Sequence, residues 1–190
     1  MKSSQHASDY IETLAASGRY TFTSAEVRSV LGGTAEAARQ ALARLQRQRL
    51  VASPARGFYV IVPPEYRALS SPPAEQFVPA LMAHFDQSYY VGLLSAAQYH
   101  GAAHHRPQEF QVMVPKARRD IAVGAVRITF FVRSHLERVP TTSLNTQRGT
   151  IRVSSPEATA LDLVGYHTRI GGLDQVATLL LHLPDRPAPN

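Results

Sequence analysis

The segment with the clearest folding signal runs from Thr34 to Gln48 and reads TAEAARQALARLQRQ. Thr34 has the side chain of a helix N-cap. One face repeats apolar residues at helical spacing: Ala38, Leu42 and Leu45, with Ala41 beside them. The other face carries Glu36, Arg39, Gln40, Ala43 and Arg47, with Arg44 at its margin. The pattern predicts a helix with one buried face and one exposed, mainly basic face.

Two further helices are predicted before this segment. The first runs from a cap at Ser8 to about Ala16. The second begins at the sequence TSAE, residues 23–26, which is a capping box, and ends at Gly32-Gly33. Two short helices joined by a glycine turn, the second displaying Arg and Gln, are typical of a helix-turn-helix.

The periodicity changes after Gln48. Residues 50–53 and 57–62 have the pattern of two strands, and Pro54 to Gly57 form the turn between them. Arg56 lies near the tip of this hairpin. A hairpin directly after a recognition helix is a wing, so residues 8–62 are predicted to be a winged helix-turn-helix.

The charge distribution favours a nucleic-acid partner. The net charge is +6, and among the 20 Lys and Arg residues only Lys2 and Lys116 are lysines. An arginine bias suits phosphate binding, although a GC-rich genome also produces one. Positive charge is denser between Arg19 and Val62 than after residue 74. The chain has no cysteine and no long apolar run, so we expect a cytoplasmic protein without disulfides or membrane spans.

The residues of the third helix and the hairpin suggest a division of roles. We expect Arg44, Arg47 and Arg56 to neutralise phosphates. We expect the start of the helix to contact base edges through Thr34, Glu36, Arg39 and Gln40. Glu36 would repel phosphate, so it either reads a cytosine amino group or orients Arg39 or Gln40. The alternative is a winged helix that binds proteins and not DNA, with the arginines as a solvated face.

Paired prolines at 63–64 and 72–73 predict a linker at 63–73 between domains at 1–62 and 74–190. The second domain is predicted to be α+β, with a small, mainly antiparallel sheet. Its expected elements are helices at 74–85 and 95–100, strands at 110–114, 126–132 and 151–153, and helices from 156 and from 173 to 182.

Several residues of the second domain invite a catalytic interpretation. His100, His104 and His105 form a cluster, but without cysteine they are expected to be packing or loop residues. Ser95 and His100 lack the surrounding nucleophile motif. Asp162 lies on a largely apolar helix and is expected to be a structural carboxylate paired with an arginine. We predict no catalytic site, cofactor or metal. The basic connection Lys116, Arg118 and Arg119 would add DNA phosphate contacts, bind a protein, or be a solvated turn.

The chain resembles the AbiEi antitoxins of bacterial type IV toxin–antitoxin systems. In the first domain the resemblance rests on IETLA (11–15), FTSAE (22–26), residues 45–50 and GFY (57–59). In the second it rests on YVGLLSAAQYHGA (90–102), the strand 110–114 and SSPEATALDL (154–163). Members often continue with further C-terminal helices, so we expect a short or truncated member.

This resemblance implies a non-enzymatic autorepressor that binds repeats in its own promoter, as a monomer or as a dimer that forms on DNA. It also implies a C-terminal domain that counters a nucleotidyltransferase-like toxin, generally without a stable complex. The DNA-binding basic positions of the family correspond to Arg39, Arg44, Arg47 and Arg56. The blocks around His100 and Ser155 are interpreted as architectural.

Overall fold

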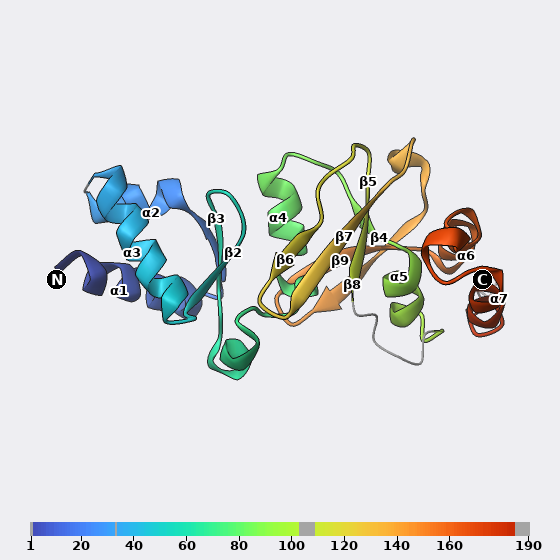
Figure 1. Ribbon diagram of the computed structural model, residues 1–190, viewed down its shortest axis with the longest axis horizontal. Helices are drawn as coiled ribbons and strands as arrows, with labels where there is room; N and C mark the ends of the chain where they lie inside the picture. Colours follow the sequence, from blue (N-terminus) through green and yellow to red (C-terminus); the bar gives the residue numbers. More distant parts are fainter. Residues whose placement is uncertain (1, 33, 103–108, 185–190) are drawn as a thin grey trace. The chain divides into compact units, whose positions relative to one another are not determined.

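The computed structural model describes residues 2–32, 34–102 and 109–184, with side chains described from Ala7 onward (Figure 1). The chain forms two compact units. The first unit consists of Met1–Phe85 with Ile121–Val126, and the second of Asp86–Asp120 with Arg127–Asn190. The proline-rich residues 63–73 therefore lie within the first unit.

Three helices and a small sheet form most of the first unit. The helices are α1 (Lys2–Ala16), α2 (Ser24–Leu31) and α3 (Ala35–Arg47). The strands are β1 (Thr21–Thr23), β2 (Val51–Ala55) and β3 (Phe58–Ile61), which pair antiparallel in the order β1-β3-β2. Strand β1 was not predicted, and α1 begins before Ser8, the expected start of the first helix.

Local signals fix the ends of α2 and α3. The capping box is confirmed, because the Thr23 hydroxyl accepts from the Glu26 amide at 3.2 Å and the Glu26 carboxylate accepts from the Thr23 amide at 2.6 Å. Gly32 ends α2 in the left-handed conformation with φ 59°. Thr34 caps α3 as expected. At the other end of α3, the Leu50 amide donates to the Leu45 carbonyl at 2.9 Å, and Arg49 adopts φ 57°.

The apolar faces of these helices meet the sheet in one core. It includes Phe22, Val27, Leu42 and Leu45, each at most 2% exposed. The Phe22 ring stacks on Tyr59 with centroids 5.5 Å apart. The burial pattern of α3 is therefore the one that its periodicity predicts.

Strand β2 extends further than expected, through Pro54 to Ala55. The β2–β3 register shifts between Ala52 and Ala55, and the Ser53 hydroxyl donates to the carbonyls of Ala55 and Phe58. Proline lacks an N–H and is accommodated where the ladder is irregular. Gly57, with φ 76°, completes the turn.

The remainder of the first unit differs from its predicted form. Residues 63–73 contain a 3-10 helix, η1 (Pro64–Leu69), where we expected extended chain. The expected helix at 74–85 is divided into η2 (Ala74–Gln76) and α4 (Val78–His84). Pro79 explains the division, because its ring and missing N–H prevent the bond to residue 75 that a continuous helix needs. Strand β6 (Ile121–Val123) was not predicted.

The sheet of the second unit is larger than predicted and mixed. Its strand order is β7-β5-β4-β9-β8. The strands are β4 (Tyr90–Val91), β5 (Phe110–Val114), β7 (Val126–Val132), β8 (Thr141–Thr146) and β9 (Gly149–Ser154). The pairs β4–β9 and β5–β7 are parallel, whereas β4–β5 and β8–β9 are antiparallel. The expected α+β class is confirmed, but the sheet is not mainly antiparallel.

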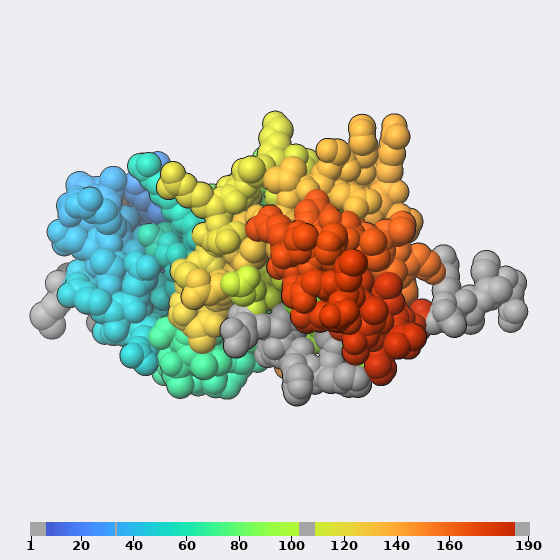
Figure 2. All heavy atoms as spheres, turned by 45° about the vertical axis from the view of Figure 1, so that its right-hand side comes forward, coloured from blue at the N-terminus to red at the C-terminus, as the bar shows by residue number. Residues whose placement is uncertain are grey.

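The second unit also contains three α-helices: α5 (Leu93–Tyr99), α6 (Pro156–Gly165) and α7 (Leu173–Leu180). It has two 3-10 helices, η3 (Leu136–Arg138) and η4 (His167–Arg169). The expected cap is present on α6, where the Ser155 hydroxyl accepts from the Ala158 amide at 3.2 Å. The space-filling view shows the α6 and α7 region, in orange and red, as a continuous surface (Figure 2). Within the described residues, no helix combines the length and apolar character needed to cross a membrane.

Candidate nucleic-acid interface

Helix α3 presents a polar face to solvent. Ala38, Ala41, Leu42 and Leu45 are buried in the core of the first unit. The opposite face contains Glu36, Arg39, Gln40, Ala43 and Arg47, all exposed. The side chain of Arg39 is 76% accessible. The helix therefore displays the charged and amide groups that the sequence analysis assigned to base contacts.

Glu36 organises this face. Its carboxylate lies 2.7 Å from the Arg39 guanidinium and accepts from the Gln40 amide nitrogen at 3.1 Å. The hydrogen bond from Arg39 lowers the pKa of Glu36 below its usual value, and the bond from Gln40 adds to this effect. Of the two arrangements expected for Glu36, the one in which it orients Arg39 and Gln40 is present in the free protein.

The other residues predicted to contact DNA from α3 differ in their exposure and in their contacts. The Thr34 hydroxyl accepts from the Ala37 amide at 3.2 Å, so it serves as the helix cap. Arg44 is half-buried at the margin of the exposed face. Arg47 is exposed, and its Nε lies 3.4 Å from the Ala43 carbonyl of its own helix. Arg47 is thus the more accessible of the two arginines of α3 that were assigned to phosphate.

The β2–β3 hairpin carries the exposed Arg56 at its tip, and α4 contacts this hairpin through His84. The His84 ring nitrogen Nε2 lies 3.4 Å from the Arg56 carbonyl oxygen. The same ring lies against Phe58, with centroids 5.2 Å apart. The contact of α4 with the hairpin was not predicted, because the two segments are separated by the proline-rich residues 63–73.

The predicted basic connection of the second unit is held by side-chain hydrogen bonds. Gln87 accepts from the Arg118 guanidinium at 3.1 Å and donates to the Lys116 carbonyl at 3.3 Å. The Asp120 carboxylate accepts from the Phe130 amide at 3.0 Å. These bonds anchor the connection, while Lys116 and Arg119 are exposed to solvent.

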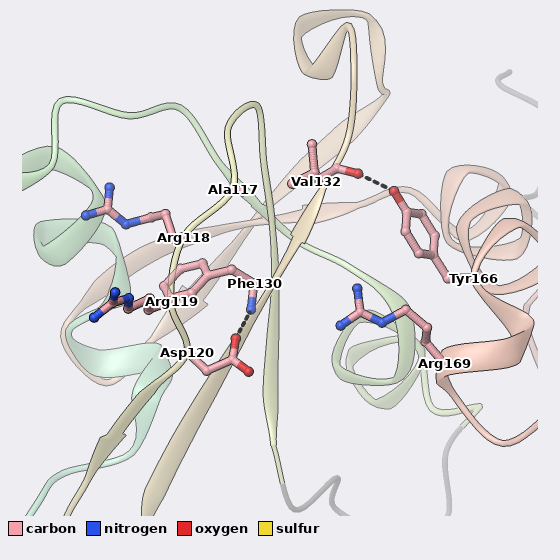
Figure 3. Close-up of a pocket in the computed structure, with 8 residues that line it drawn as sticks. All are labelled: Ala117, Arg118, Arg119, Asp120, Phe130, Val132, Tyr166 and Arg169. Atoms are coloured by element: carbon pink, nitrogen blue, oxygen red, sulfur yellow. Dashed lines mark hydrogen bonds between the residues drawn. The ribbon is translucent and has the colours of Figure 1, made fainter.

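Arg118 and Arg119 line a hollow together with a third arginine, Arg169, which the sequence analysis missed (Figure 3). Lys116 is not among the lining residues. Arg169 lies far along the sequence, in η4, and no local motif marks it. Figure 3 shows Arg169 on the opposite side of Phe130 from Arg118 and Arg119, so its place in the lining depends on the path of the chain through the second unit.

The residues considered for catalysis have structural contacts. The Ser95 hydroxyl accepts from the Gln111 amide at 2.9 Å, and His100 Nε2 lies 2.7 Å from the Ser154 carbonyl. Within the described ranges, no three or more His, Cys, Asp or Glu residues are grouped to hold a metal. His104 and His105 lie outside those ranges.

Asp162 has the structural role that the sequence analysis assigned to it. Its side chain is completely buried, forms an ion pair with Arg133, and accepts from the Tyr90 hydroxyl at 2.7 Å. Burial raises the pKa of Asp162, and hydrogen bonds from Tyr90 and Arg133 oppose this shift. The arginine partner expected for this carboxylate is confirmed as Arg133.

The fold is similar to that of one solved structure. The RV2827C protein from Mycobacterium tuberculosis is similar to the chain, with TM-score 0.59, 15% identity, and 97% of this chain and 84% of that chain covered. An antigenic nucleotidyltransferase-like protein from Paracoccidioides brasiliensis aligns with TM-score 0.43 and 8% identity over 58% of this chain and 73% of that chain. No curated protein matches the sequence.

The family comparison is more specific. The model of the AbiEi antitoxin C-terminal domain matches residues 90–190, which is more than half of the chain. The matched residues include both sequence blocks on which the resemblance in the second domain rests. The chain belongs to the AbiEi antitoxin family.

Proposed function

We propose that this protein is a transcriptional autorepressor that binds double-stranded DNA of its own promoter through a winged helix-turn-helix. The main support for this proposal is the arrangement of α3. Its apolar residues are buried, and on its exposed face Glu36 contacts Arg39 and Gln40. The order of elements in the first unit, from α1 to β3, also suits a winged helix, with α3 as the recognition helix and β2–β3 as the wing.

The proposed mechanism separates base readout from phosphate contacts. The Arg39 fork suits the O6 and N7 acceptors of guanine, and the Gln40 amide suits the N6 and N7 edge of adenine. Arg44, Arg47 and Arg56 would neutralise phosphates and fix the orientation of the protein on the duplex. On this proposal residues 1–62 are the DNA-binding domain, and two protomers associate mainly on paired half-sites.

We further propose that residues 74–190 act in the cytoplasm against a nucleotidyltransferase-like toxin from the same operon. Membership of the antitoxin family supports this role. In the promoter complex, the Lys116, Arg118 and Arg119 connection would add phosphate contacts. Neither role assigns catalysis to this chain.

Fluorescence anisotropy of the full chain with its upstream promoter DNA and with a scrambled duplex of equal length tests the repressor proposal. We expect tighter binding to the promoter and a steep fall in affinity as salt rises. Absence of binding to either duplex at low salt would favour the alternative of a protein-interaction module. Co-expression with the neighbouring toxin gene tests the antitoxin role, which predicts restored growth.

A further inference from the structure

The β2–β3 hairpin of the first unit is buried on both of its faces. Tyr59 and Ile61 face the three helices, where the Tyr59 ring stacks on Phe22. Phe58 and Val60 alternate with them along the strand and therefore point to the opposite face of the sheet. Both are nevertheless buried, at 3% and 1% exposed. A hairpin that packed only on the helices would leave this second face in water, so other parts of the chain cover it.

Helix α4 contacts the hairpin near its tip. The His84 ring lies against Phe58, with centroids 5.2 Å apart, and its Nε2 lies 3.4 Å from the Arg56 carbonyl oxygen. This contact is made to the backbone of Arg56, so it constrains the direction of the tip and does not involve the guanidinium. His84 is itself exposed. The helix that carries it is anchored by three buried residues, Val78, Leu81 and Met82.

A second contact comes from residues 121–126, much later in the sequence. Strand β6 contacts β2 within the first unit. The turn after β6 fits closely against η1, because the Ala125 amide donates to the Leu69 carbonyl at 2.8 Å and a Cβ on Gly124 would lie 2.3 Å from that oxygen. Residues 121–126 therefore pack with the first unit, although they lie inside the region that the antitoxin family model matches.

These contacts matter for Arg56 because β2 is weakly held within its own sheet. It is an edge strand in the order β1-β3-β2, and its register with β3 shifts between Ala52 and Ala55. An arginine at a mobile tip would lose more conformational freedom on binding a phosphate than one at a fixed tip. Contacts on the second face would fix the tip before DNA binds.

We propose that His84 and residues 121–126 are positioning elements of the DNA interface, which hold the hairpin so that Arg56 meets the phosphate backbone. This inference rests on the proposed DNA-binding function and extends it. The DNA-binding module then comprises residues 1–62 together with 74–85 and 121–126. His84 acts on DNA binding through Arg56 and not through a contact of its own.

A double-mutant cycle in the full chain tests the role of His84. In anisotropy with the promoter duplex, His84→Ala should weaken binding about threefold to tenfold, the cost of ordering one long side chain on binding. The loss should largely disappear in the Arg56→Ala background and persist in the Arg47→Ala background, because only residues that act together are coupled. His167→Ala is the control, because the His167 ring contacts the Val164 carbonyl in the second unit.

Amide hydrogen exchange of the full chain without DNA tests the hold on the hairpin directly. His84→Ala and Gly124→Ala should each speed exchange at residues 55–60 several-fold, because loss of a contact makes local opening easier. Gly149→Ala is the control for Gly124→Ala. Gly149 also has a positive φ, 112°, but a Cβ there would meet nothing within 4 Å. Melting curves of all variants exclude global unfolding as the cause.

Two results would overturn this inference and leave the proposed function intact. An equal effect of His84→Ala in the wild-type, Arg56→Ala and Arg47→Ala backgrounds would show that His84 does not act through Arg56. Hairpin exchange equal to wild type in both His84→Ala and Gly124→Ala would show that neither contact holds the hairpin. Failure of the wild type to bind either duplex would instead refute the proposed function, and faster hairpin exchange in the variants would still show that these contacts hold the hairpin.

Discussion

Asp162 on α6 and Arg133 at the end of β7 form an ion pair whose carboxylate is completely inaccessible to solvent, while the arginine side chain is 33% exposed. The Tyr90 hydroxyl of β4 donates to the second carboxylate oxygen at 2.7 Å. Burial and the neighbouring carboxylate raise the pKa of Tyr90, so it remains a donor at physiological pH. A buried carboxylate is tolerated only when its oxygens have such partners.

Removal of either partner should therefore destabilise the protein. We expect Arg133→Met to lower the free energy of unfolding by about 3–5 kcal/mol, because it leaves a buried charge unpaired. Tyr90→Phe should cost about 1–3 kcal/mol through the lost hydrogen bond. Urea unfolding at neutral pH measures both, with the exposed Arg138→Met as control. Unfolding midpoints equal to wild type for both variants would contradict a structural role for this network.

Glu26 should make stability depend on pH. Burial alone would raise its pKa, but hydrogen bonds from Arg19 and Thr23 outweigh this effect and lower the pKa below its usual 4.5. A lowered folded-state pKa means that the contribution of Glu26 is complete above about pH 4.5 and is lost as pH falls through the folded-state value. Glu26→Gln should therefore destabilise the chain at pH 7 and much less in acid. Unfolding at a series of pH values checks this, with exposed Glu12→Gln as control. An equal loss at every pH would contradict the argument.

Arg39 and Arg56 should affect DNA binding in different ways. Arg39→Ala should weaken promoter binding by roughly 1–3 kcal/mol and relax sequence preference, as loss of a base contact does. Arg56→Ala should weaken promoter and random duplexes alike and reduce the salt dependence. Anisotropy on both duplexes at several salt concentrations measures this. If Arg39→Ala reduced affinity equally on the two duplexes, Arg39 would have no role in base readout.

Glu36 should reduce affinity and increase selectivity. Its carboxylate would repel nearby phosphates, yet it contacts Arg39 and Gln40 at 2.7 and 3.1 Å. Glu36→Gln should therefore raise affinity for random DNA and lower the ratio of promoter to random binding. Glu12→Gln makes the same charge change on α1 and is the control. An unchanged ratio would mean that Glu36 does not orient its neighbours on DNA.

Gly124 and Gly32 form a matched pair for a test of packing. Both adopt left-handed backbone, with φ 54° and 59°. A Cβ on Gly124 would lie 2.3 Å from the Leu69 carbonyl oxygen, whereas one on Gly32 would meet nothing within 4 Å. Both alanine variants should lose about 1–2 kcal/mol from backbone strain, and Gly124→Ala should lose a further ~1–3 kcal/mol from the overlap. Thermal unfolding compares them. Equal losses would show that the chain at Leu69 moves aside easily.

Much of the first unit follows from local sequence. Thr23, Glu26 and Thr34 set helix starts through bonds that span three residues, and the apolar period of α3 marks its buried face. The α6 start at Ser155-Pro156 is equally local. In contrast, β1 and β4 are too short for a periodic signal, and each exists because a distant strand supplies its hydrogen-bond partners. Pro79 divides the segment that was expected to form one helix at 74–85.

The candidate sites also combine features that the local sequence predicts with contacts that only the tertiary structure shows. The sequence specifies which residues of α3 face solvent, because helical geometry requires only the spacing of Ala38, Leu42 and Leu45. It could not pair Arg133 with Asp162, bring His84 against the hairpin, or predict that Arg169 lines the same hollow as Arg118 and Arg119. Those contacts join segments distant along the chain, and they arise when strands pair and apolar faces are buried. Local hydrogen bonds and periodicity can be read from neighbouring residues, but long-range contacts depend on how the whole chain packs.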